Sequence, residues 1–242
     1  MLLLKNVIKT RQIDKKKTMK KKNSYVGVAF IILLFGIYTV PKVVDRFKTN
    51  AELVYLYTNE REPKKRKVPA FEFTNQEGAS ITNKDYENKV YVVEFFFSTC
   101  PSICPIMNQK MVAIQDDFFG NPEFGIASIS ITPEIDTPDV LKAYAKENGI
   151  THKNWHLLTG KPDDVVFALA KQGFKLYAGK GTDGHGGFEH SGYFALVDKR
   201  GFIRSRKDEN GNVIIYYNAL QDNGFPDQIK ELKEDIKILL NE

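Results

Sequence analysis

Cysteine is scarce in this chain: its 242 residues include two, Cys100 and Cys104. A structural zinc ion usually takes four protein ligands, so the pair would need two further donors to form such a site. The sequence also lacks internal repeats and low-complexity segments. With 42% hydrophobic residues, the chain can form one good-sized domain plus accessory segments.

The globular part of the chain lacks an excess of positive charge. Residues 1–24 contain nine Lys or Arg residues and one acid, Asp14, which gives this segment a net charge of +8. Because the whole chain carries +5, the remainder carries −3. Nucleic-acid binding needs a basic face, so we expect no nucleic-acid partner.

Charge is absent altogether from Asn23–Pro41, a run of 19 residues. As a helix this run would be about 28 Å long, close to one bilayer crossing. The alternative is a cleaved signal peptide, but its apolar core is usually shorter, about 7–15 residues, and ends at a small-x-small site. The run leads instead into VPKVVDRF, which has no such site. We therefore expect one uncleaved transmembrane helix at 23–41.

The basic residues before this helix predict its orientation. Under the positive-inside rule, residues 1–22 form a cytoplasmic tail and the C-terminal part lies outside the cytoplasm. A start at Met1 or at Met19 gives the same topology. The chain has no Arg- and Ser-rich, acid-poor presequence of mitochondrial type, so we expect the inner membrane of a prokaryote, with the domain on the periplasmic side.

Two further boundaries are expected beyond the anchor. Residues 42–67 are of mixed charge and end in REPKKRK, which favours a solvated juxtamembrane linker over a lipid-binding patch. The compact domain is expected to span residues 68–242.

Strands and helices alternate within that domain. Strands are expected at Phe71–Thr74, Ser80–Thr82, Val90–Phe97, Phe124–Ile131, Trp155–Leu158, Tyr193–Asp198 and Phe202–Arg206. Helices are expected at Ile106–Phe118, after a cap at Asp136 or Thr137, at Asp163–Gln172 and at Asp227–Leu240. This alternation predicts an α/β fold with a mostly parallel central sheet covered by helices.

The two cysteines follow a predicted buried strand, at the expected start of a helix. Residues at i and i+4 of a helix lie on one face, so both sulfurs can reach one metal ion or form one disulfide. The helix N-terminus lowers thiol pKa values and favours the thiolate. A structural disulfide is an alternative, although so short a loop constrains the unfolded chain little. A redox pair is another, although thioredoxin-type enzymes place two residues between their cysteines and this chain places three.

Several runs of the domain resemble the Sco (SenC) family of membrane-anchored, thioredoxin-fold copper chaperones. They are VPAFEFTNQEGASITNKDYENKVYVVEFFFSTCPSICPIMN, SISITPEIDTPDVLKAYAKENGI, NWHLLTG and HSGYFALVDKRGFIR, and the likeness covers about residues 68–240. The resemblance implies a copper site made by Cys100, Cys104 and His190. The Asp136–Pro138 string also resembles the family, whereas Glu189 stands where the family often has aspartate.

The implied function is a copper chaperone that supports assembly of the binuclear copper centre of cytochrome c oxidase, with subunit II or another copper-receiving protein as partner. Two thiolates and an imidazole suit copper, and the residues leave open whether Cu(I), Cu(II) or both bind. A three-ligand site also keeps an open flank for transfer. The competing function is a thiol-disulfide reductase that acts on the cysteines of a metal-receiving protein. A peroxidase of the peroxiredoxin type has no support.

The other candidate donors are not expected to bind metal. His152 and His156 flank a loop-to-strand junction and are expected to be structural, and His185 is expected to be solvated. Met107 belongs to an apolar helical stripe and is expected in the core. The segment Gly179–Gly187 contains five glycines, which predicts a loop that is loosely ordered without copper.

Overall fold

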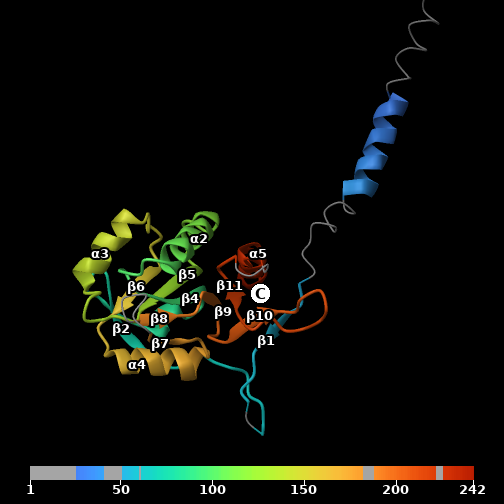
Figure 1. Cartoon of the computed structure of the whole chain (residues 1–242). Helices are drawn as coiled ribbons and strands as arrows, with labels where there is room; N and C mark the ends of the chain where they lie inside the picture. The colour runs from blue at the N-terminus through green and yellow to red at the C-terminus, as the bar shows by residue number, and fades with distance from the viewer. Residues whose placement is uncertain (1–25, 41–50, 60, 182–187, 222–225) are drawn as a thin grey trace, which may run out of the picture. The chain divides into compact units, whose positions relative to one another are not determined.

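The computed structural model describes residues 26–40, 51–59, 61–181, 188–221 and 226–242. The chain divides into two compact units, Met1–Asn50 and Ala51–Glu242. The described part of the first unit is a helix over residues 26–40, drawn in blue in Figure 1. Within the described ranges, no helix has both the length and the hydropathy of a membrane span. The expected anchor at 23–41 begins and ends outside those ranges, and it stays a prediction.

The second unit is built on a mixed β-sheet. Its strands lie in the order β1-β10-β9-β4-β5-β6-β2-β3, and β11 also pairs with β9. The strands of this sheet are β1 (Leu53–Tyr55), β2 (Glu72–Asn75), β3 (Ser80–Thr82), β4 (Val90–Phe96), β5 (Phe124–Ser130), β6 (Trp155–Thr159), β9 (Tyr193–Val197), β10 (Ile203–Arg206) and β11 (Tyr217–Asn218). A separate antiparallel pair is formed by β7 (Ala178–Lys180) and β8 (Phe188–His190).

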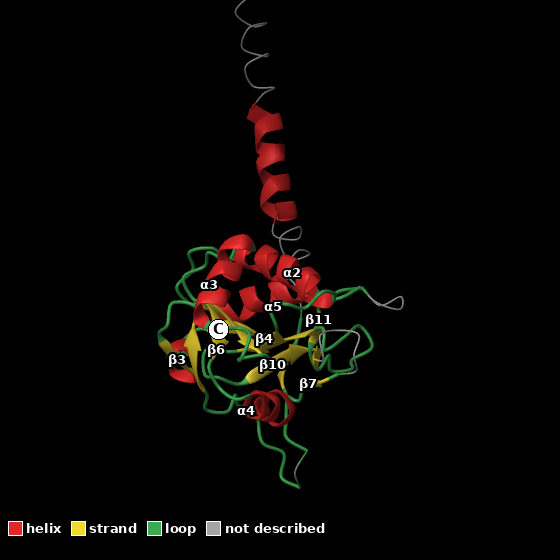
Figure 2. Ribbon diagram, turned by 60° about the vertical axis from the view of Figure 1, so that its left-hand side comes forward, coloured by secondary structure: helices red, strands yellow, loops and turns green. Residues whose placement is uncertain are grey.

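Helices cover both faces of this sheet. They are η1 (Asn83–Tyr86), α2 (Ile103–Asp117), α3 (Pro138–Glu147), α4 (Asp163–Ala168), its π-helical continuation η2 (Leu169–Phe174), and α5 (Ile229–Leu240). Helices α2, α3 and α5 lie on one side and α4 on the other (Figure 2). This mixed α/β sheet with flanking helices agrees with the thioredoxin-like architecture implied by the family resemblance.

The prediction of a mostly parallel sheet was wrong. Among the described strands of the sheet, only β4, β5 and β6 run parallel, and the other pairings are antiparallel. Parallel neighbours need a long crossover, here supplied by α2 and α3, whereas short turns join β2 to β3 and β9 to β10 as hairpins. All seven residues of β4 are buried, as expected for a central strand covered on both faces.

The folded unit begins earlier than the expected boundary at Val68. Strand β1 pairs antiparallel with β10, with Leu53 opposite Arg206. Leu56 is buried, and its carbonyl accepts a hydrogen bond from the amide of Arg66 at 2.7 Å. Strand β1, which lies within the segment expected to be a linker, therefore forms an edge of the sheet. The pairing partner lies about 150 residues away in the sequence, beyond the reach of a local composition pattern.

The helix starts were predicted with mixed success. Thr137 caps α3 as expected: its side chain accepts a hydrogen bond from the amide of Val140, and Pro138 occupies the first turn. The helix expected at Asp163–Gln172 is present as α4 followed by η2. Helix α2 begins at Ile103, which changes the placement of the cysteines.

Candidate metal centre

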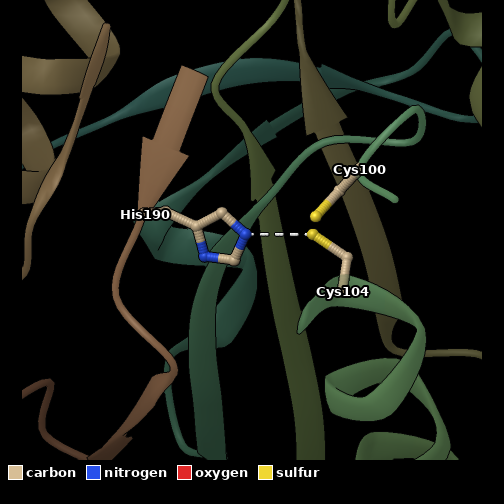
Figure 3. Close-up of side chains that lie close together, drawn as sticks. All are labelled: Cys100, Cys104 and His190. Atoms are coloured by element: carbon tan, nitrogen blue, oxygen red, sulfur yellow. Dashed lines mark hydrogen bonds between the residues drawn. The ribbon is translucent and has the colours of Figure 1, made fainter. Parts of the chain in front are cut away.

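Three separate elements carry Cys100, Cys104 and His190. Cys100 lies in the loop between β4 and α2, Cys104 in the first turn of α2, and His190 at the last position of β8 (Figure 3). The prediction that both cysteines share one helical face was therefore wrong, because Cys100 precedes the helix. A tight turn, in which the Cys100 amide donates to the Phe97 carbonyl at 3.2 Å, returns Cys100 towards the helix start.

The three side chains converge on one point. Their donor atoms all lie within 4.8 Å of one another, and Cys104 Sγ is 2.9 Å from His190 Nε2. Metal–sulfur bonds of about 2.3 Å and metal–nitrogen bonds of about 2.0 Å place the donors of a three-coordinate ion about 4 Å apart. Both cysteines are free thiols, and all three residues are buried. The arrangement can accept one metal ion with little movement.

The imidazole of His190 is oriented for ligation. Its Nδ1 lies 3.2 Å from the carbonyl oxygen of Ser191, which can only accept, so Nδ1 carries the proton. In the neutral ring, the lone pair of Nε2 then points at the sulfurs. A hydrogen bond from the other ring nitrogen, like the one from Nδ1 to Ser191, is the usual way to orient a ligating histidine. The ring of Phe97 packs edge-on against His190 at 5.8 Å.

The two thiols have opposite protonation preferences. A hydrogen bond from the Cys104 side chain, together with the backbone amides of Cys104 and Ser102, lowers the pKa of Cys100 to about 3 against the opposing effect of burial. The same hydrogen bond raises the pKa of Cys104, and burial raises it further. This pairing favours the thiolate form at Cys100 and the protonated form at Cys104. The helix N-terminus was expected to lower the pKa of both thiols; the pKa of Cys100 is lowered chiefly by the Cys104 side chain, and the pKa of Cys104 is raised.

A buried carboxyl behind Cys104 was missed by sequence analysis. Burial raises the pKa of Glu94 to about 7, opposed by a 2.6 Å hydrogen bond from the Ser128 hydroxyl. A small cavity is lined by Glu94, Cys104 and Tyr144, among other residues. The only sequence signal is a single acid inside the strand expected at Val90–Phe97.

The site opens on one side into a cavity of about 290 Å³. Its lining is mostly apolar and includes the Cys100 side of the centre. The full lining is Phe97, Cys100, Ser102, Ile103, Tyr177, Phe188, Glu189 and His190. A ligand from another molecule can therefore approach the donor atoms from this side without unfolding the domain.

His152, His156 and Met107 do not join the centre. His152 Nδ1 accepts a hydrogen bond from the Asn154 amide at 3.1 Å, and His156 Nδ1 lies 3.3 Å from the side-chain nitrogen of Asn75. Burial lowers the pKa of both histidines, which keeps them neutral. Met107 is buried in the core, as expected.

Of the glycine-rich segment Gly179–Gly187, the structure describes residues 179–181. Residues 182–187, which include His185, lie outside the described residues. The expectation of a loose loop at Gly179–Gly187, and of a solvated His185, therefore stays a prediction.

Comparison with known proteins identifies the family. Residues 59–222 match the SCO1/SenC family, so the chain belongs to that family. The SCO1 protein homolog of Bacillus subtilis is 28% identical over 174 residues, which cover 72% of this chain and 84% of that protein. An SCO2-like protein of Rickettsia typhi is 34% identical over 138 residues, covering 54% of this chain and 65% of that protein.

Solved structures agree with this assignment. The crystal structure of a SCO1/SenC family lipoprotein from Bacillus anthracis has a TM-score of 0.61 and 27% sequence identity, over 74% of this chain and 98% of that chain. The structure of BsSco, described as a member of the Sco family of cytochrome c oxidase assembly proteins with a disulfide switch, has a TM-score of 0.59 and 26% identity, over 74% of this chain and 96% of that chain.

Proposed function

We propose that this protein is a Sco-type copper chaperone that binds one copper ion through Cys100, Cys104 and His190. The observation that carries the proposal is the convergence of two thiols and one imidazole, all within 4.8 Å, beside an open cavity. Soft sulfur donors favour Cu(I), and an added imidazole also suits Cu(II). A zinc ion bound for structure would favour a fourth protein ligand, which the centre does not offer among the described residues.

Copper is the cargo in this proposal, and the chain's own groups control its capture and release. The lowered pKa of Cys100 favours its thiolate, and Cys104 loses its proton when it ligates the metal, because thiolates are the binding form. His190 needs no proton change at Nε2. Release then begins from the cavity side, where an incoming ligand reaches the three-coordinate ion.

The acceptor we propose is cytochrome c oxidase, at the binuclear copper centre of its subunit II. Support comes from family membership and from BsSco, a relative described as a member of a family of oxidase assembly proteins. The Arabidopsis thaliana ScoI structure contains copper, but at 23% identity its likeness shows the fold, so the choice of copper rests on the donor chemistry.

A second candidate function is reduction of disulfides in a metal-receiving protein. The low pKa of the Cys100 thiol, beside a cavity, favours it. In that reaction the Cys100 thiolate attacks a substrate disulfide and releases one substrate thiolate. Cys104 then attacks the mixed disulfide, so that the substrate leaves with both thiols reduced and the Cys100–Cys104 pair becomes oxidised. A thiol donor must re-reduce the pair before another cycle.

One experiment separates the two functions. The copper-loaded full chain is mixed anaerobically with the pre-reduced copper domain of oxidase subunit II, and in parallel the copper-free reduced chain is mixed with the disulfide form of that domain. We expect copper to move to the acceptor in the first mixture, faster than from a small copper chelate of equal affinity. New acceptor thiols in the second mixture, with no copper transfer in the first, would favour the reductase instead.

We also propose that residues 23–41 anchor the protein in the inner membrane, with the domain on the periplasmic side. The described helix over 26–40 carries large apolar side chains that are exposed at consecutive positions, from Phe30 to Phe35, and therefore around its whole circumference. Such a helix needs an apolar environment. We expect the full chain to stay in the membrane pellet after alkaline extraction, and a chain lacking 23–41 to be released. Release of the full chain would contradict the anchor.

A further inference from the structure

A buried carboxylate links the cysteine loop to the neighbouring strand. Asp136 lies between β5 and α3 and has no exposed surface. Its carboxylate accepts hydrogen bonds from four uncharged groups: the Ser130 hydroxyl at 2.5 Å, the Thr132 hydroxyl at 3.0 Å, the Ser98 amide at 3.2 Å, and the Ser98 hydroxyl. An ionised carboxylate only accepts hydrogen bonds, and its two oxygens provide about four lone-pair positions. The donors around Asp136 match that capacity.

Two of these hydrogen-bond partners lie close to Asp136 in the chain, and the third lies on a different loop. The hydrogen bonds from Ser130 and Thr132 stay within the end of β5 and the loop that follows it. Those from Ser98 reach across to the loop after β4, two residues before Cys100. The hydrogen bonds from Ser98 therefore act on the segment that presents a candidate metal ligand.

The contact to Ser98 lies where backbone pairing stops. The parallel ladder between β4 and β5 ends with Phe96 opposite Ser130, followed by the hydrogen bond from the Ile131 amide to the Phe96 carbonyl at 2.9 Å. Beyond it the loop that follows β4 and carries Cys100, here called the Cys100 loop, leaves the sheet. The Asp136 carboxylate then holds this loop beside the end of β5 through Ser98. Hydrogen bonds to a charged acceptor are about twice as strong as neutral ones. The hydrogen bonds from Ser98 to Asp136, here called the clamp, can therefore hold the base of the loop.

We propose that Asp136 is a positioning residue for the metal centre: by holding Ser98, it fixes the Cys100 loop at the distance from Cys104 and His190 that one metal ion requires. Asparagine cannot replace it, because the amide group turns one acceptor into a donor that faces hydroxyl and amide donors. The copper part of this inference rests on the proposed function, whereas the anchoring of the loop does not.

The test uses the full chain, reduced and metal-free, with three variants. Ser98→Ala and Asp136→Asn remove or weaken the clamp, and Thr132→Val removes a hydrogen bond to the same carboxylate on the β5 side. We expect amide exchange at residues 98–100 to accelerate at least about tenfold in Ser98→Ala and Asp136→Asn, because local opening governs exchange there. Thr132→Val is expected to stay within about twofold at those amides. Ser98→Thr keeps the hydroxyl and should retain protection.

Copper affinity gives the second readout. We expect Cu(I) affinity to fall at least about tenfold in Ser98→Ala and Asp136→Asn, a loss of about 1.4 kcal/mol, and to be unchanged in Thr132→Val. Unchanged exchange in Ser98→Ala, or equal acceleration in Thr132→Val, would overturn the inference. So would faster exchange with unaltered copper affinity. If Asp136→Asn fails to fold, the comparison of Ser98→Ala with Thr132→Val still tests whether Ser98 holds the loop. If the wild-type chain binds no Cu(I), the proposed function fails while exchange still tests the clamp.

Discussion

Replacing either Cys100 or Cys104 by serine is expected to weaken Cu(I) binding on the order of a thousandfold. A hydroxyl stays protonated at neutral pH and is a hard donor, whereas Cu(I) selects soft thiolates. One thiolate and one imidazole remain in each variant, so binding becomes weak but measurable. Competition against a chromogenic Cu(I) chelator, under anaerobic conditions, gives the affinities.

The matched control for this prediction is Ser102→Ala. Ser102 lines the same cavity, and its hydroxyl oxygen lies 3.8 Å from Cys100 Sγ, but its hydroxyl is a hard donor that Cu(I) does not favour. We expect its Cu(I) affinity to stay within about threefold of the wild type. A serine variant of either cysteine that binds copper as tightly as Ser102→Ala would remove that cysteine from the site.

The second large effect concerns the imidazole. We expect His190→Ala to lower Cu(II) affinity on the order of a hundredfold and Cu(I) affinity by about tenfold, because two thiolates alone can hold Cu(I), whereas Cu(II) prefers additional nitrogen ligands. Electron paramagnetic resonance of the Cu(II) form should lose its nitrogen hyperfine coupling at the same time.

Other histidines of the chain provide the controls for His190→Ala. His156→Ala and His185→Ala are expected to leave both copper affinities unchanged, since His156 contacts Asn75 away from the sulfurs and His185 is expected to be solvated. A damaging His185→Ala together with a silent His190→Ala would show that the ligand had been assigned to the wrong histidine.

The parts of the molecule that sequence analysis predicted well depend on local patterns. The buried strand at Val90–Phe97, the cap at Thr137 and the hairpin after Tyr193–Asp198 each follow from spacing within a few residues. The cysteine pair stood out because the chain contains no other cysteine. His190 required the family resemblance, since its approach to the sulfurs crosses 86 residues of sequence.

The parts that were missed depend on contacts between distant segments. Strand β1 is recognisable only through its pairing with β10, and the antiparallel neighbours of β4 follow from the order of strands, which local periodicity does not encode. The helix expected from Ile106 begins three residues earlier, at Ile103. Glu94 and Asp136 act through hydrogen bonds to residues on other strands and loops.

X-ray absorption at the copper edge, measured on the reduced full chain loaded with one equivalent of copper, tests the central claim most directly. Sulfur and nitrogen scatterers are distinguishable in such spectra, so the ligand set is read without substitution. The account predicts two sulfur ligands and one imidazole nitrogen around copper. A first shell of nitrogen and oxygen alone, or a spectrum that stays the same after Cys100 and Cys104 are oxidised to a disulfide, would contradict it.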